Sequence, residues 1–164
     1  MPSLGSERRF VKYLLQQRYY RTIGGGVVFA GAARLGLASA FGQLLIPSER
    51  FFAGGGNSVR GYAEDVLGPV DTFGDVIGGS ALVVLNGEAR FPLFKMVRGV
   101  GFFDGGRAFD SVKAITLTDL SVGTGIGLRV QTPVVLVRID FGIPLDRSTG
   151  PRPGRWFVSI GQAF

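Results

Sequence analysis

The most regular stretch of the sequence is Val135-Leu136-Val137-Arg138-Ile139-Asp140-Phe141-Gly142-Ile143-Pro144-Leu145. Its odd positions are all apolar, whereas Arg138, Asp140 and Gly142 share the even positions. Because the side chains of a β-strand alternate between two faces, this period of two predicts a strand with one apolar face. Its length suits a tilted membrane strand of about 9–11 residues better than a soluble strand of about 5–6. Placing Arg138 against lipid would cost roughly 2–4 kcal/mol near the midplane, so the charged face is expected to point away from lipid.

The same alternation recurs along the chain. From Leu120 to Val130 the even positions are Leu, Val, Thr or Ile, and the odd positions are Ser, Gly or Arg. No stretch offers 18 consecutive apolar residues, so a transmembrane helix is excluded and a closed barrel is the remaining way to cross lipid. The sequence therefore predicts an all-β fold, the C-terminal portion of a transmembrane antiparallel β-barrel. About seven strands are expected, near residues 11–19, 27–41, 81–91, 100–109, 120–130, 135–145 and 156–164.

The connections between these segments alternate in length. Reading back from the C-terminus, residues 146–154 form a long link, 131–133 a tight turn, 110–119 a long link and 92–98 a short one. The longest connection covers residues 43–75. Outer-membrane barrels join their strands by short periplasmic turns and longer extracellular loops in this order. The pattern predicts that 43–75 is an extracellular loop, and a soluble β-sandwich has no reason to follow it.

Composition excludes several other classes of function. The chain has neither His nor Cys, so the commonest general base and all thiol chemistry are missing, and no enzyme activity, cofactor or metal is expected. The net charge of +6 suits an anionic partner, but the basic residues are dispersed, which argues for lipid head groups and against nucleic acid. The first residues do not form a signal peptide, so the chain is expected to be truncated at its N-terminus.

The long connection contains the most specific string of the chain. It reads Arg50-Phe51-Phe52-Ala53-Gly54-Gly55-Gly56-Asn57-Ser58-Val59-Arg60-Gly61-Tyr62, followed by Leu67-Gly68-Pro69. This string resembles the signature of the large extracellular loop in the BamA/TamA superfamily of outer-membrane assembly factors, also called bacterial surface antigens. The resemblance implies that the loop folds back into the barrel and that its tip, Val59-Arg60-Gly61-Tyr62, lies in the lumen. The flanks Phe-Phe-Ala-Gly-Gly and Leu-Gly-Pro favour the TamA-like side of the family.

A second motif of that family, Phe-x-Asp-x-Gly, reads Phe102-Phe103-Asp104-Gly105-Gly106 here. In the family this Asp pairs with the loop Arg, so the resemblance implies a pair between Asp104 and Arg60. A bidentate pair of this kind supplies geometry as well as attraction. The alternatives are that Arg60 is a solvated loop charge and that Asp104 is a turn residue before its two glycines. The other residues expected to form a polar lumen are Glu88, Arg90, Arg129, Arg138 and Asp140.

The chain ends in Trp156-Phe157-Val158-Ser159-Ile160-Gly161-Gln162-Ala163-Phe164, which resembles the C-terminal β-signal of outer-membrane barrels. Its alternation places Trp156, Val158 and Ile160 on one face, and Phe164 is the closing aromatic residue. Gly161 is expected to loosen the pairing of this strand, because glycine weakens a strand interior.

The resemblance also implies a function and a location. The family's barrel has sixteen strands, of which about the last seven are expected in residues 1–164, and the periplasmic POTRA domains are absent. The implied protein lies in the outer membrane of a Gram-negative-type bacterium and inserts or exports client β-barrel or secreted proteins. Its other implied partners are outer-membrane lipid and subunits in the periplasm or inner membrane. The alternative function is a passive pore or surface antigen on the same scaffold.

Overall fold

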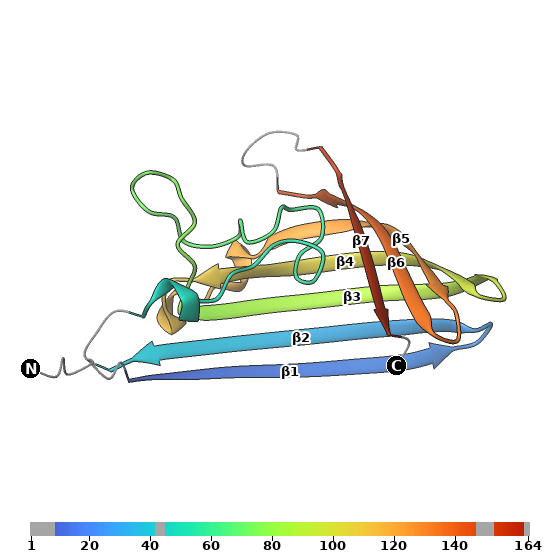
Figure 1. The fold of residues 1–164 in the computed structure, drawn as a ribbon, viewed down its shortest axis with the longest axis horizontal. Coiled ribbons are helices and arrows are strands. Elements are labelled where there is room, and N and C mark those ends of the chain that lie inside the picture. Colours follow the sequence, from blue (N-terminus) through green and yellow to red (C-terminus); the bar gives the residue numbers. More distant parts are fainter. Residues whose placement is uncertain (1–8, 42–44, 147–152, 163–164) are drawn as a thin grey trace, which may run out of the picture.

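The computed structural model describes residues 9–41, 45–146 and 153–162. They form one antiparallel sheet of seven strands in sequence order, so each strand pairs with its neighbours along the chain. In Figure 1, β1, β2 and β3 run side by side, whereas β6 and β7 turn across them, so the sheet curls. The strands are β1 (Phe10–Ile23), β2 (Val27–Ala40), β3 (Ala81–Phe94), β4 (Val97–Phe109), β5 (Ser121–Gln131), β6 (Val135–Pro144) and β7 (Arg155–Gln162). Three short 3-10 turns lie between them, at Pro47–Glu49, Val112–Ala114 and Leu117–Asp119.

The all-β antiparallel fold predicted from the alternation is confirmed, with all seven strands in the predicted places. The connections differ in their bounds. The turn between β3 and β4 contains only residues 95–96, because both strands extend into the predicted link. The connection between β2 and β3, here called the long loop, covers residues 41–80 and exceeds the predicted 43–75. Its returning limb pairs with the loop itself, through bridges between Val70 and Val76 and between Phe51 and Gly79.

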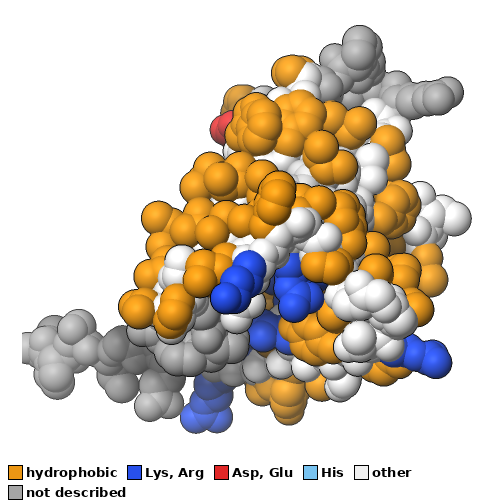
Figure 2. Space-filling view, turned by 90° about the vertical axis from the view of Figure 1, so that its right-hand side faces the viewer, with side chains coloured by type: hydrophobic (Ala, Val, Ile, Leu, Met, Phe, Trp, Pro, Cys, Tyr) orange, Lys and Arg blue, Asp and Glu red, His pale blue; other side chains and the backbone are white. Residues whose placement is uncertain are grey.

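The apolar face of the strands points outward. On β6, Arg138, Asp140 and Gly142 lie on the inner face of the curl, opposite the inward residues of β5. An outer face with large exposed apolar side chains is what a lipid-facing surface requires. Figure 2 looks at the end that carries the short turns and shows hydrophobic side chains over most of that view. The exposed residues on the outer face include Tyr13, Leu15, Tyr19, Phe29, Leu85, Phe103, Ile126, Leu128, Trp156, Val158 and Ile160.

The main buried core lies between the long loop and the inner face of the sheet. The loop supplies most of its members, and the strands supply small or branched side chains that let the loop approach. No helix of the described residues is long and apolar enough to cross a membrane. The core residues are Leu45, Phe51, Ala53, Val59, Tyr62 and Leu67 from the loop, with Ala38, Leu82, Val84 and Ala108 from the strands.

β1 and β7 are the two edges of the described sheet. β7 is the shortest strand and pairs with β6 over eight residues, whereas β1 and β2 pair over fourteen. An edge strand presents backbone N–H and C=O groups that another strand can bind. Among the described residues, the sheet therefore has a shorter edge at β7 and a longer one at β1.

Candidate functional site in the lumen

The tip of the long loop lies inside the curl of the sheet, on the inner faces of β3 to β6 (Figure 1). The neck of the loop is closed by Phe51 and Gly79, which exchange two backbone hydrogen bonds of 2.8 Å. The backbone N–H of Ala108 on β4 donates to the carbonyl of Leu67, which ties the loop to the sheet. The tip residues 59–62 are buried as a result.

Arg60 contacts three carboxylates that come from three different strands. Its Nε and Nη2 donate to Oδ2 and Oδ1 of Asp104 on β4, at 2.6 and 2.8 Å. Its Nη1 donates to Glu88 Oε1 on β3 at 2.6 Å and to Asp140 Oδ2 on β6 at 3.2 Å. The side chains of Arg60 and Asp104 are 3% and 0% exposed. This arrangement, here called the Arg60 clamp, joins the loop tip to strands on both sides of β5.

Two further side chains complete the surroundings of the pair. The guanidinium carbon of Arg60 lies 3.6 Å from the centre of the Phe102 ring, a cation–π distance. Asn86 Nδ2 donates to Asp104 Oδ1 at 2.8 Å and to the carbonyl of Ser58 at 2.7 Å. The backbone N–H of Arg60 also donates to Asp104 Oδ2, at 3.2 Å. Both carboxylate oxygens of this buried acid are therefore fully used, as a buried charge requires.

The electrostatics keep the loop tip charged. Burial alone would lower the pKa of Arg60, because it disfavours the charged form. The hydrogen bond and charge of Asp104, followed by the charges of Glu88 and Asp140, outweigh burial and raise the pKa of Arg60 above its ordinary value. The guanidinium is thus a permanent cation at the centre of the site.

The loop backbone can reach the strands because the strands present glycines to it. A Cβ on Gly123 of β5 would lie 1.9 Å from the carbonyl oxygen of Arg60, and one on Gly142 of β6 would lie 2.6 Å from the backbone nitrogen of Gly61. Gly61 itself has a φ of 101°, in the left-handed region that favours glycine. A Cβ added to Gly61 would lie 2.7 Å from the backbone carbonyl carbon of Ile143. Gly106 leaves similar room for Val59, whose Cγ2 would be 3.0 Å from an added Cβ. These glycines form a groove that receives the main chain of the loop tip and, at Gly106, the side chain of Val59.

Tyr62 fastens the far side of the loop tip. Its hydroxyl donates to Asp146 Oδ2 at 2.8 Å and lies 3.1 Å from the carbonyl oxygen of Val122. Burial, followed by the hydrogen bond and charge of Asp146, raises the pKa of Tyr62 to about 12. Both causes favour the neutral phenol in the folded protein.

The raised pKa of Tyr62 predicts a loss of stability at high pH. Between the ordinary value of 10.0 and about 12, an unfolded Tyr62 has released its proton and a folded one has not. Alkali therefore favours unfolding in that window, and the stabilisation present below pH 10 is lost as the pH rises through the folded value. Tyr62→Phe is expected to remove this part of the decline, measured as the heat-unfolding midpoint of the full-length protein against pH. Tyr19→Phe, an exposed outward position, is the control and should keep the decline of the unaltered protein.

The structure separates the predicted site residues into two groups. Val59, Arg60, Gly61, Tyr62, Phe102, Asp104 and Gly106 gather around the loop tip on the inner face. Trp156, Val158 and Ile160 point outward on β7, with Trp156 packed 4.9 Å from Phe141 between ring centres. Gly161 pairs with Leu136, and Phe164 lies outside the described residues.

Four partners of the loop tip were not assigned to it from the sequence. Glu88 and Asp140 were expected in a polar lumen, but not in contact with Arg60. Asn86 stands two residues before Glu88 and therefore lies on the same face of β3. This alternation could have placed Asn86 in the lumen beside Glu88. Asp146 carries no such signal, because it follows the end of β6.

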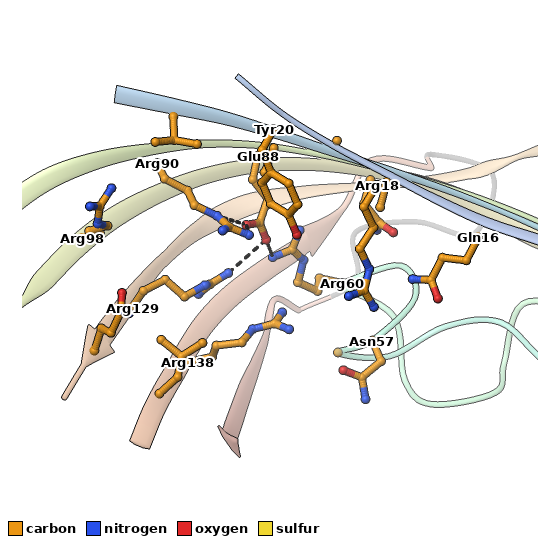
Figure 3. A pocket seen from close by; sticks show the side chains of 18 of the residues that line it. Gln16, Arg18, Tyr20, Asn57, Arg60, Glu88, Arg90, Arg98, Arg129 and Arg138 are labelled. Carbon is orange, nitrogen blue, oxygen red and sulfur yellow. Dashed lines mark hydrogen bonds and ion pairs between the residues drawn. The ribbon is translucent and has the colours of Figure 1, made fainter. Parts of the chain in front are cut away.

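A cavity of about 650 Å³ adjoins the Arg60 clamp (Figure 3). Its walls carry seven arginines and one glutamate, contributed by β1 to β6 and the loop. Arg34 of β2 donates into the loop, to the carbonyl of Asn57. Within residues 9–41, 45–146 and 153–162, no group of three acidic, His or Cys side chains is arranged to hold a metal ion. The site is thus a docked loop beside a cationic lumen.

The family follows from a match over the whole chain. The model of the Omp85 superfamily domain matches residues 1–164. The chain belongs to the Omp85 superfamily. The predicted resemblance to the outer-membrane assembly factors of this superfamily is therefore confirmed, together with the barrel fold that it implied.

The relatives of this Omp85 chain include a bacterial protein and a chloroplast protein. The outer membrane protein assembly factor BamA of Nitratidesulfovibrio vulgaris is 33% identical over 98% of this chain and 21% of its own length. Outer envelope protein 39 of Arabidopsis thaliana chloroplasts is 31% identical over 80% of this chain and 37% of its own length. The chain thus spans about a fifth to two fifths of these relatives. These relatives do not test whether the chain belongs to the TamA-like subgroup, so that assignment stays a prediction.

A solved structure shows the same fold. The crystal structure of BamA from Haemophilus ducreyi lacking POTRA domains 1–3 superposes on this Omp85 chain with a TM-score of 0.78. The match covers 96% of this chain and 36% of that one, at 20% sequence identity. The curled seven-stranded sheet is therefore part of a barrel fold shared with BamA.

Proposed function

We propose that this chain is the C-terminal part of the barrel of an outer-membrane factor that inserts or exports other proteins in a bacterial outer membrane. It acts without catalysis of covalent chemistry, as a binding and folding surface. The Arg60 clamp is the observation that carries the proposal, because it locks the long loop across the inner face of the sheet. The named relatives include an assembly factor, which favours this role over a passive pore.

The proposed mechanism uses the edges of the sheet. β7 is short, is paired on one side within the described sheet, and contains Gly161, which has no atom within 4 Å of an added Cβ. A client strand can add to such an edge through main-chain hydrogen bonds. The gain comes from the client's own hydrogen bonds and apolar burial, so no nucleotide or metal is required. The Arg60 clamp holds β3, β4 and β6 in fixed positions while the edge opens.

The proposed partners follow from the outer face of the sheet and from its edge. The outer face, with Ile126, Trp156 and Val158 exposed, suits outer-membrane lipid. Client β-barrel or secreted proteins are the partners of the edge. POTRA domains and subunits in the periplasm or inner membrane would deliver those clients.

The proposal is tested by client folding in liposomes that contain the full-length protein. The unaltered protein should speed the appearance of a protease-resistant, heat-modifiable client barrel, and Arg60→Ala should slow it about tenfold or more. Lys113→Ala removes an exposed charge from another loop and should leave the rate unchanged. Steady ion conductance without any gain in client folding would replace the proposal with the passive pore.

A further inference from the structure

Three arginines stand directly side by side on the inner face of the sheet. Arg98 of β4 is the cross-strand partner of Arg129 on β5, and Arg129 is the partner of Arg138 on β6. Directly opposed residues in a sheet have Cβ atoms about 4.5–5.5 Å apart, and like charges in such pairs are destabilising. This arginine row therefore carries an electrostatic cost that the fold alone does not explain.

The acidic residues of the lumen offset this cost unevenly. Arg129 is paired with Asp140 at 2.5 Å and with Glu88 at 3.0 Å. Arg138 reaches Asp140 at 3.2 Å, but its buried Nε has no hydrogen-bond partner. Arg98 is exposed and pairs with no carboxylate among the described residues. Arg129, in the middle of the row, is thus neutralised more fully than Arg98 and Arg138 at its two ends.

The arginine row borders the cavity of about 650 Å³ (Figure 3). In that view Arg98, Arg129 and Arg138 lie at one end of the cavity, on the opposite side from Arg18 and Asn57. Seen from the end with the short turns, basic side chains gather near the middle of a mostly hydrophobic surface (Figure 2). A partly enclosed cavity with walls of one charge concentrates ions of the opposite charge.

We propose that the arginine row is a binding site for a phosphate group, presented by a small phosphate-bearing anion or by a lipid head group. Guanidinium forks match phosphate oxygens in pairs of parallel hydrogen bonds. Arg98, which pairs with no described carboxylate, and Arg138, whose Nε has no hydrogen-bond partner, can donate to one tetrahedral group that has several oxygens and up to two charges. Arg129 lies between them and stays paired with Asp140 and Glu88. A single carboxylate offers two oxygens and one charge, and so satisfies the row less well. The site is separate from the client-binding edge proposed above.

The test uses the full-length protein in detergent at low ionic strength, titrated with inorganic pyrophosphate by calorimetry. Saturable binding is expected, and Arg98→Gln should weaken it about tenfold. Arg98 is the variant of choice because its removal leaves no described carboxylate unpaired, unlike removal of Arg129. Lys95→Gln removes a charge from the neighbouring turn and should change the affinity less than twofold. Heat-modifiable mobility on gels checks that each variant is folded.

Nanodiscs distinguish the two sources of phosphate. If phosphatidylglycerol discs weaken pyrophosphate binding and phosphatidylcholine discs do not, the site takes a lipid head group; if neither competes, it takes a free anion. Absence of saturable binding, or equal weakening by Arg98→Gln and Lys95→Gln, would overturn the proposal. Either result would mean that acidic groups in other parts of the full-length protein neutralise the row. Arg98→Gln should leave client folding unchanged, so this proposal can fail without the proposed function.

Discussion

Arg60→Ala is expected to lower the free energy of unfolding of the full-length protein by about 3–5 kcal/mol, the usual cost of removing one partner of a buried ion pair. The change leaves Asp104, which is fully buried, with only Asn86 as a side-chain donor. It also removes a cation from Glu88 and Asp140. Urea unfolding in detergent, followed by heat-modifiable mobility on gels, measures the loss.

Two further variants separate charge from geometry. Arg60→Lys keeps the charge but cannot make the two-pronged contact with Asp104, so its loss should be intermediate. The double variant Arg60→Met with Asp104→Leu removes both buried charges and should recover part of the stability lost by Arg60→Ala. A loss below about 1 kcal/mol for Arg60→Ala would show that the clamp does not stabilise the barrel.

Gly123→Ala is expected to displace the loop tip and to cost about 3 kcal/mol, near the upper end for overpacking. The new methyl group would lie 1.9 Å from the carbonyl oxygen of Arg60, a backbone atom that can move only if the tip moves with it. Gly105→Ala is a matched control, because Gly105 faces Val122 on the adjoining strand and has no atom within 4 Å of an added Cβ.

Limited proteolysis reads out the position of the loop directly. In the unaltered protein and in Gly105→Ala, the buried tip around Arg60 should resist cleavage. In Gly123→Ala, trypsin is expected to cut after Arg60 at a protease level that leaves the strands intact. Equal resistance in all three proteins would mean that the tip does not depend on the glycine groove.

The faces of the strands could be predicted from the sequence, because alternation depends only on whether a side chain prefers lipid. Arg138 and Asp140 were expected to avoid lipid, and they lie on the inner face. The position of the long loop between β2 and β3 followed from the break in alternation. Its last residues were missed, since residues 76–80 include two glycines and do not resemble either strand or loop clearly.

The partners of each inward residue could not be predicted in the same way. A slip of one residue between strands would turn every side chain to the wrong face, but a slip of two would keep all of them in place. Alternation therefore places Glu88 and Asp140 on the inner face without showing that both reach Arg60. The arginine row could not be predicted for the same reason, because it exists only in the strand register that aligns Arg98 with Arg129.

The clamp also constrains the order in which the chain can fold. Arg60 is joined to groups that follow it by 28, 44 and 80 residues. The entropy cost of closing a loop rises with the number of residues it contains, and contacts between distant residues form slowly. The contact with Asp140 closes the longest of the three loops, so it is expected to form last, after β6 has paired with β5. By the same reasoning, the tip should contact Glu88 and Asp104 before the last strands complete its enclosure.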